Sequence, residues 1–272
     1  DIYVRALARH LGKYIPGSPN IIVQNIPAAG GMALVNQLYN TLPKDGSYIG
    51  MVRGTAIQEE VYKSPQVQFH GRRFAWLGNM NSDHDACIVS AASGVHTIGD
   101  LYTHQVVAGA SGVGAQSYSF PVVYRDLLGM KFKVISGYPG TPERMIALER
   151  GEITGAFGIS LSLFQSQFSR VVKEGKVRLI AQGALHADLR YADVPNILDQ
   201  AKPPEIRQAL EFLYLALELG RSLAAPPDTP RDRLAVLRAA VAETMRDPDF
   251  LIDAKKLDID IAPMNAEETQ AA

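Results

Sequence analysis

Residues Gly109-Ala110-Ser111-Gly112-Val113-Gly114-Ala115-Gln116-Ser117 form a stretch rich in small residues. An apolar run with β-branched residues, 105–108, precedes it, and residues 118–128 follow it with apolar side chains at helical spacing. The order is therefore strand, loop of small residues, helix. Glycines let a backbone approach a ligand closely, and the first N–H groups of a helix favour a carboxylate or a phosphate. The stretch indicates either an anion site or an ordinary tight turn with a helix cap.

The glycine spacing of this loop is a poor match to a dinucleotide-binding fingerprint. It reads G-x-x-G-x-G, and no acidic residue stands clearly at the end of a next strand about 20 positions further on. The loop also contains no Lys or Arg. An anion bound here would therefore be held mainly by backbone dipoles.

The same order of strand, small-residue loop and helix recurs along the chain. Short apolar runs at 21–23 and 48–52 each lead into such a loop. Further strands are predicted at 74–78, 86–91, 133–136, 153–158 and 177–181. This alternation predicts a parallel sheet with helices on its faces, in which ligands bind beyond the carboxyl ends of the strands. The loops at Gly30, Thr55 and Ser111 occupy that kind of position.

Helix signals are also present in both halves of the chain. Thr97 and Thr141 are each predicted to cap a helix, the second with Pro142 at the first helical position. Amphipathic helices are predicted over residues 2–14 and 231–245.

Length and composition limit the classes of protein. The 272 residues allow one large domain or two of ordinary size, and the hydrophobic fraction of 47% is ample for packed cores. The formal net charge of -1 gives no support to a nucleic-acid partner. A single cysteine, Cys87, excludes an internal disulfide, and no apolar run approaches the roughly 18 residues of a membrane span. The chain opens at Asp1 in helical periodicity and without Met, so we expect a preceding strand and any export signal to lie outside it.

Six short motifs in a fixed order carry a resemblance to a known family. They are Asn25-Ile26-Pro27-Ala28-Ala29-Gly30-Gly31, Pro43-Lys44-Asp45-Gly46-Ser47-Tyr48, Ser111-Gly112-Val113-Gly114-Ala115, Tyr138-Pro139-Gly140, Ala225-Pro226-Pro227-Asp228-Thr229-Pro230 and Asp247-Pro248-Asp249-Phe250. Together they resemble the substrate-binding proteins of tripartite tricarboxylate transporters, the Bug family of bacterial periplasmic receptors. The resemblance extends from Asp1 to about Glu268.

The resemblance implies an α/β, type II periplasmic binding protein fold, in which two α/β domains joined by a two-crossover hinge close on a ligand. Domain one would comprise residues 1–92 plus 222–272, and domain two residues 93–221. The family consists of receptors, not enzymes. Its members bind a small organic carboxylate in the periplasm, need no cofactor or metal, and deliver the ligand to the membrane subunits of the transporter. A signal peptide, a monomeric state and the absence of nucleic acid are expected on the same basis.

The resemblance also implies a set of ligand-binding residues. Backbone amides of one loop would hold a carboxylate, and this loop comprises Ser111, Gly112, Gly114, Ala115, Gln116 and Ser117. A second wall would be formed by Tyr138, Gly140 and Thr141. The first domain would supply Gly30, Gly31 and Met32, with Thr55 at the rim. Asp1 matches the aspartate that closes the family's first binding loop, and Ser160 completes the predicted set.

Two departures from the family pattern bear on the ligand. Pro139 stands where the family has a lysine, and Gly158 stands where it often has an aspartate that faces a ligand amine. The second departure argues against an amino-acid ligand. A partly apolar pocket is expected from Met32, Tyr138, Phe157 and Ile159. Such a pocket favours a dicarboxylate with a hydrocarbon middle, or an aromatic acid, over citrate.

Other chemistry has weaker support. His84 lies between Asp83 and Asp85, but neighbouring residues of a strand point to opposite sides, so a solvated loop is favoured over a metal site. The remaining histidines lack metal-ligand spacing. Arg221 is interpreted either as a partner for a ligand carboxylate or as half of a structural ion pair.

The alternative function is that of a cytoplasmic α/β enzyme which binds a nucleotide phosphate through residues 109–114. Ser111 as a nucleophile would need an adjacent base, and no G-x-S-x-G motif is present. An export signal before residue 1 would favour the receptor, whereas a plain cytosolic start would favour the enzyme.

Overall fold

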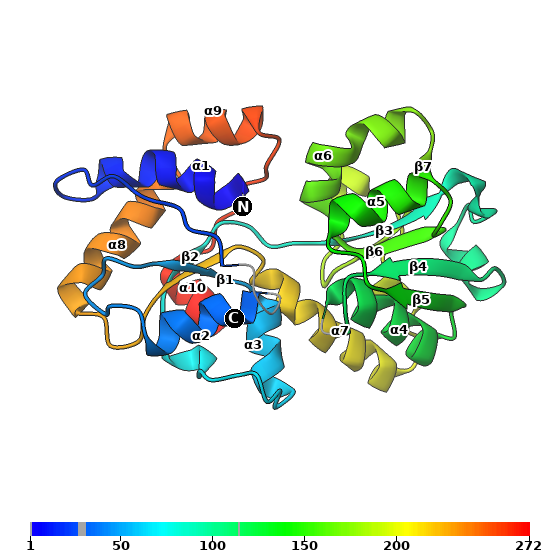
Figure 1. Ribbon diagram of the computed structural model, residues 1–272, viewed down its shortest axis with the longest axis horizontal. Helices are drawn as coiled ribbons and strands as arrows, with labels where there is room; N and C mark the ends of the chain where they lie inside the picture. The colour runs from blue at the N-terminus through cyan, green and yellow to red at the C-terminus, as the bar shows by residue number, and fades with distance from the viewer. Residues whose placement is uncertain (1, 27–30, 114) are drawn as a thin grey trace. The chain divides into compact units, whose positions relative to one another are not determined.

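The chain divides by its internal contacts into two compact units. The computed structural model describes residues 2–26, 31–113 and 115–272. Unit 1 comprises Asp1–Asp83 and Leu215–Ala272, and unit 2 comprises His84–Tyr214 (Figure 1). The predicted domains, 1–92 plus 222–272 and 93–221, are the two parts of the chain expected to close on a ligand. This division stays a prediction.

Unit 1 is built on a small antiparallel sheet. Among the described residues this sheet has three strands in the order β1-β8-β2. Their bounds are Gly50–Val52 for β1, Ala75–Asn79 for β2 and Ser222–Ala225 for β8. Leu223 and Ala224, which are adjacent in β8, belong to two different apolar cores, because neighbouring side chains of a strand point to opposite faces. Helices therefore cover both faces of this sheet.

The helices of unit 1 fall into two groups by core. The first core contains residues of α1 (Ile2–Leu11), α8 (Arg231–Thr244) and α9 (Pro248–Lys256). The second contains residues of α2 (Met32–Asn40), and α3 (Gly54–Val61) packs against it through Ala56 and Ile57. The helix α10 (Ala266–Ala271) lies beside β2. Short 3-10 helices occur at Gly12–Tyr14 and Gly71–Arg73.

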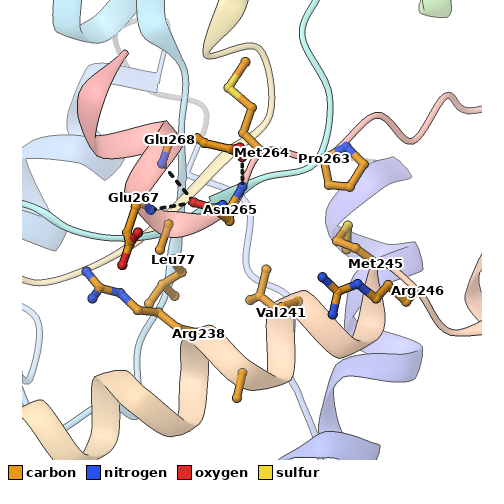
Figure 2. A pocket seen from close by; sticks show the side chains of 13 residues that line it. Leu77, Arg238, Val241, Met245, Arg246, Pro263, Met264, Asn265, Glu267 and Glu268 are labelled. Atoms are coloured by element: carbon orange, nitrogen blue, oxygen red, sulfur yellow. Dashed lines mark hydrogen bonds between the residues drawn. The ribbon is translucent and has the colours of Figure 1, made fainter.

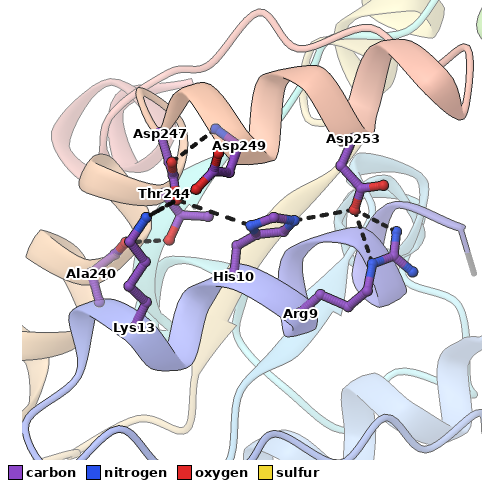
Figure 3. Close-up of polar contacts among 8 residues, drawn as sticks. All are labelled: Arg9, His10, Lys13, Ala240, Thr244, Asp247, Asp249 and Asp253. Atoms are coloured by element: carbon purple, nitrogen blue, oxygen red, sulfur yellow. Dashed lines mark hydrogen bonds and ion pairs between the residues drawn. The ribbon is translucent and has the colours of Figure 1, made fainter.

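A line of charged side chains joins α1 to α9 (Figure 3). Arg9 donates through Nε and Nη2 to the Asp253 carboxylate, at 2.9 and 2.7 Å. His10 lies 3.1 Å from the same carboxylate, and Lys13 donates to Asp247 at 3.0 Å. Arg9 and His10 belong to α1, Lys13 to the 3-10 helix that follows it, and Asp247 is the N-cap residue of α9. These ion pairs and hydrogen bonds connect the start of the chain to a segment near its end.

Unit 2 is built on a larger mixed sheet. Among the described residues it has five strands in the order β5-β4-β6-β3-β7. Their bounds are Asp85–Ser90 for β3, Val106–Ala110 for β4, Phe132–Ser136 for β5, Gly155–Ser160 for β6 and Val177–Gly183 for β7. The strand β4 is parallel to β5 and β6, whereas β3 is antiparallel to β6 and β7. The carboxyl ends of β5, β4 and β6 therefore meet at one edge of the sheet.

Helices cover both faces of the unit 2 sheet (Figure 1). The helices α5 (Thr141–Glu149) and α6 (Leu161–Lys173) lie on one face, and α4 (Gln116–Leu128) lies on the other. The helix α7 (Pro204–Glu218) contributes residues to both units. Short 3-10 helices occur at Ala91–Ser93, Ile98–Tyr102, Leu189–Tyr191 and Ile197–Gln200.

Two strand predictions were wrong. Residues 21–23 belong to no strand, and Ile22 is 77% exposed. A cavity of about 510 Å³ is lined by α1, by residues 21–26 and by the β1 segment. The prediction of a parallel sheet holds for part of unit 2 only, because in unit 1 both described strand pairs are antiparallel. The reason is that β8 comes from a distant part of the chain, whose direction local patterns do not reveal.

The two predicted helix caps had different outcomes. Thr97 caps its 3-10 helix in a capping box with Asp100, as predicted. Thr141 is instead the first residue of α5, and Gly140 is the cap. The Gly140 carbonyl accepts the first helical hydrogen bond, from the Arg144 amide at 3.2 Å, while the Thr141 hydroxyl accepts from the Arg144 side chain at 3.0 Å.

Candidate functional site

The predicted binding residues of unit 2 that the structure describes lie where three strands end. Ser111 follows β4, residues 137–140 follow β5, and Ser160 ends β6. These strands are neighbours in the sheet, and two of them lead directly toward the helices α4 and α5. The first N–H groups of each helix have no acceptor within the helix, so two sets of such donors face the same edge of the sheet.

The loop after β4 is tied to the first turn of α4. The Ser111 amide donates to the Ser117 hydroxyl oxygen at 3.1 Å, and Ser117 is only 3% exposed. The Ala115 amide donates to the Gly112 carbonyl at 3.0 Å, which closes a tight turn directly before Gln116. The Ser117 hydroxyl thus has a structural partner within the loop that the sequence analysis assigned to a ligand.

The strand β6 approaches α4 without room for a side chain at Gly158. This glycine has φ +64°, and a Cβ placed there would lie 2.3 Å from the Ser117 nitrogen. A glycine fits this position for both reasons. The position at which the family often has an aspartate therefore cannot hold one here unless α4 moves.

The loop after β5 packs over the end of β4. The amides of Gly137 and Tyr138 both donate to the Ala110 carbonyl, at 3.1 and 3.2 Å. The Tyr138 ring lies against Gly109, where an added Cβ would be 3.2 Å from the ring. The two predicted walls of the site are thus in direct contact within unit 2.

Arg144 lies beneath these loops, and it is not among the residues predicted from the sequence. Its side chain is buried, with 2% exposure. It donates to the Phe157 carbonyl at 2.7 Å and to the Gly109 carbonyl at 3.5 Å, in addition to the Thr141 hydroxyl. Burial lowers the pKa of Arg144 to about 10, and the charge of Asp85 acts in the opposite direction. An arginine at an inward position of an otherwise apolar helix face was the available signal.

Asp85 is a second buried ionisable group of unit 2. One of its oxygens accepts from the Ile159 amide at 3.1 Å, and the other from the Tyr124 hydroxyl at 3.3 Å. Burial raises the pKa of Asp85 to about 7, against the effect of its hydrogen bonds. The prediction of a solvated loop at residues 83–85 was wrong, because Asp83 and Asp85 are 4% and 2% exposed. The described residues contain no group of three or more His, Cys, Asp or Glu that could hold a metal ion.

The predicted residues of unit 1 lie at two helix starts. Gly31 caps α2 with φ +96°, and Met32 shares an apolar core with Val52 at the end of β1. Thr55 is the second residue of α3, which begins shortly after β1. Asp1, Gly30 and Gly114 fall outside the described residues.

Arg221 forms an ion pair within unit 1. Its Nη1 lies 3.0 Å from the Asp83 carboxylate, and its guanidinium lies 4.8 Å from the centre of the Tyr3 ring. Arg221 and Asp83 are 9% and 4% exposed. Of the two interpretations given to Arg221, the structural ion pair is confirmed.

Another cavity lies elsewhere in unit 1. It has a volume of about 610 Å³, and it lies between α8 and the start of α10 (Figure 2). Leu77, Val241 and Met245 line it together with the arginines Arg238 and Arg246. None of the predicted binding residues lines it. Within the described part of the chain, no helix combines the length and the apolar character needed to cross a membrane.

Comparisons with known proteins identify the family. Among solved structures, the periplasmic binding protein BugD gives a TM-score of 0.74 at 20% identity, covering 100% of this chain and 87% of that one. A Rhodopseudomonas palustris protein with adipate gives 0.73 at 15% identity, covering 98% and 86%. MatC from Rhodopseudomonas palustris with bound malate gives 0.69 at 17% identity, covering 94% and 83%.

At these identities the structural likeness shows the fold, and it confirms the periplasmic binding protein architecture expected from the sequence. No curated protein matches the chain. The family model described as the tripartite tricarboxylate transporter family receptor, TctC, matches residues 4–271. This chain therefore belongs to the TctC family of solute-binding receptors.

Proposed function

We propose that this protein is a periplasmic receptor that binds a small organic carboxylate and delivers it to the membrane subunits of a tripartite tricarboxylate transporter. The observation that carries the proposal is the meeting of the β4 and β5 loops with the starts of α4 and α5 in unit 2. The first turns of both helices lie at the end of the sheet where β4 and β5 end, and the loop over residues 109–117 has no Lys or Arg side chain.

We assign the carboxylate to the loop that contains Ser111, Gly112 and Gln116, with Tyr138 and Thr141 as the facing wall. Ser117 supports this loop through the bond that its hydroxyl makes to the Ser111 amide. Gly31, Met32 and Thr55 are proposed to contribute from unit 1. A monomer is the proposed functional state.

The proposed ligand is a dicarboxylate with a hydrocarbon middle, or an aromatic acid. Tyr138 brings an apolar surface to the strand ends, and no carboxylate is available at Gly158 to pair with a ligand amine. The structural neighbours with adipate and malate support the first class of ligand.

A thermal-shift panel tests this proposal. It would compare adipate, malate, benzoate, citrate and aspartate with ATP as the probe of the alternative enzyme function. A ligand present at 100 times its Kd adds about 2.7 kcal/mol to the free energy of unfolding. We expect a shift with adipate or benzoate and none with aspartate. A panel in which no organic acid raises Tm would contradict the receptor proposal, and a shift with ATP alone would favour a nucleotide site.

A further inference from the structure

The loops at the strand ends of unit 2 carry no cationic side chain of their own, yet a cation lies directly behind them. Arg144 belongs to α5, and its Nη1 reaches the carbonyl of Gly109, two residues before Ser111. The same nitrogen donates to Phe157, whose carbonyl directly precedes Gly158. Its Nη2 donates to Thr141 at the start of α5. One guanidinium thus touches all three segments that frame the predicted carboxylate site.

Within the described residues, the carboxylate that acts on the charge of Arg144 is that of Asp85, and it does so from beyond ion-pair distance. The hydrogen-bond acceptors of Arg144 are two carbonyls and a hydroxyl, all of them neutral. Arg144 forms no ion pair within the described residues, and its Nε is buried without a hydrogen-bond partner there. Arginines are seldom fully buried unless they are paired, because removing the charge from water is costly. A buried cation of this kind is favoured by an anion bound nearby.

We propose that Arg144 is the residue that makes the unit 2 site selective for anions, by placing a buried positive charge behind the loops without touching the ligand. The inference rests on the proposed function and adds to it the source of charge selectivity. The backbone N–H groups orient the carboxylate, and Arg144 stabilises its charge through a medium of low dielectric constant. Arg144 is therefore a positioning and specificity residue, distinct from the residues that contact the ligand.

Arg178 provides a matched control in the same unit. It is a half-buried arginine of β7 that also donates to a backbone carbonyl, that of Ala91, at 2.8 Å. Residues 89 and 178 pair in the sheet, as do residues 85 and 160, so Arg178 lies at the end of the sheet opposite to Ser160. Removing it deletes a similar structural bond far from the predicted site.

The test compares charged and neutral ligands by isothermal titration calorimetry. The probes are adipate with its neutral diamide, and benzoate with benzamide, which represent the two proposed ligand classes. The proteins are the wild type, Arg144→Met, Arg144→Lys and Arg178→Met. We expect Arg144→Met to weaken binding of the acid about 10- to 30-fold and to change binding of the amide by less than about twofold. Arg144→Lys should restore most of the preference for the acid, and Arg178→Met should leave it unchanged.

The possible failures can be told apart. If the wild type binds neither acid, the proposed function itself is contradicted. If the wild type binds an acid but Arg144→Met keeps the same ratio of acid to amide affinity, the proposed function stands and the role of Arg144 is refuted. A parallel loss of Tm and of both affinities in Arg144→Met and Arg144→Lys would show that Arg144 has only a structural role.

Discussion

Asp85 is a buried residue through which neutral pH should act on the stability of unit 2. Its carboxyl is 2% exposed, and burial raises its pKa from 3.8 to about 7. The folded state therefore holds this proton to a higher pH than the unfolded state does. The stability that the protonated form contributes is complete below about pH 4, and it is lost as the pH rises through about 7.

We predict that Asp85→Asn makes unfolding less sensitive to pH. The asparagine oxygen can still accept from the Ile159 amide, and the side chain no longer has to ionise in a buried place. One unit of pKa corresponds to about 1.4 kcal/mol, so the wild type should lose between about 1 and 4 kcal/mol between pH 5 and 8. Urea unfolding followed by far-UV circular dichroism at several pH values would measure this loss.

Asp100→Asn is the control for that experiment. Asp100 accepts from the amides of His96 and Thr97, and these bonds lower its pKa, so its titration lies below the window. Its replacement should leave unchanged the pH dependence of the free energy of unfolding between pH 5 and 8. An Asp85→Asn variant with the same slope as the wild type would show that Asp85 is already ionised throughout this range.

At the scale of elements, the close approach of β6 to α4 positions the loop that we assign to the carboxylate. We predict that Gly158→Ala destabilises the protein by roughly 2–4 kcal/mol, because a Cβ would lie 2.3 Å from the Ser117 nitrogen at a positive φ. The shift of α4 should also weaken binding of adipate or benzoate. Urea unfolding by far-UV circular dichroism would measure the stability, and calorimetry the binding.

Gly129→Ala is a control that has the backbone strain of a positive φ without the steric clash expected at residue 158. Gly129 ends α4 with φ +76°, but a Cβ there would have no atom within 4 Å. Its replacement should cost about 1 kcal/mol and leave ligand binding intact. Equal costs at the two glycines would show that the contact between β6 and α4 adjusts freely.

How well the sequence predicted these elements depends on the range of the interactions that form them. The periodicity at residues 2–14 and 231–245 identified α1 and α8, because a helix shows its buried face within a few turns. The run at 21–23 did not form a strand, because a strand needs a partner that local residues do not specify. The prediction of parallel strands was wrong in unit 1 for the same reason.

The candidate site was predicted in part. The order of strand, small-residue loop and helix placed Ser111 and Tyr138 at strand ends, and the structure brings them to neighbouring strands. Arg144 was missed because its acceptors, the carbonyls of Gly109 and Phe157, come from other strands. Local patterns reveal the N–H donors at a helix start. They do not reveal that the side chain of Arg144 packs against the loops next to these donors.

At the scale of the whole molecule, the chain crosses between the two units twice, at residues 83–84 and 214–215. The segments of unit 1 next to these two crossings are bonded to each other. Asp83 is the last residue of the first segment of unit 1, and its amide donates to the Leu217 carbonyl at 2.8 Å. Its carboxylate pairs with Arg221, whose amide donates to the side chain of Asn79 at 3.0 Å. The two segments are thus connected by a buried ion pair and by hydrogen bonds from both backbone and side chains, including those of Asn79 and Ser82 to the Glu218 carbonyl.

We predict that Arg221→Met destabilises unit 1 by about 3–5 kcal/mol, because it leaves the buried Asp83 carboxylate without its closest cation. Arg53, at 3.8 Å from that carboxylate, compensates only in part. The double variant Asp83→Asn with Arg221→Met should be more stable than Arg221→Met alone, since it also removes the uncompensated charge.

Trp76 is the single tryptophan and is buried in β2, so its fluorescence reports the unfolding of unit 1. Far-UV circular dichroism reports both units. A variant that shifts the fluorescence transition more than the circular dichroism transition would place the loss in unit 1. Unchanged transitions would show that the hydrogen bonds between the two segments hold them together without the ion pair.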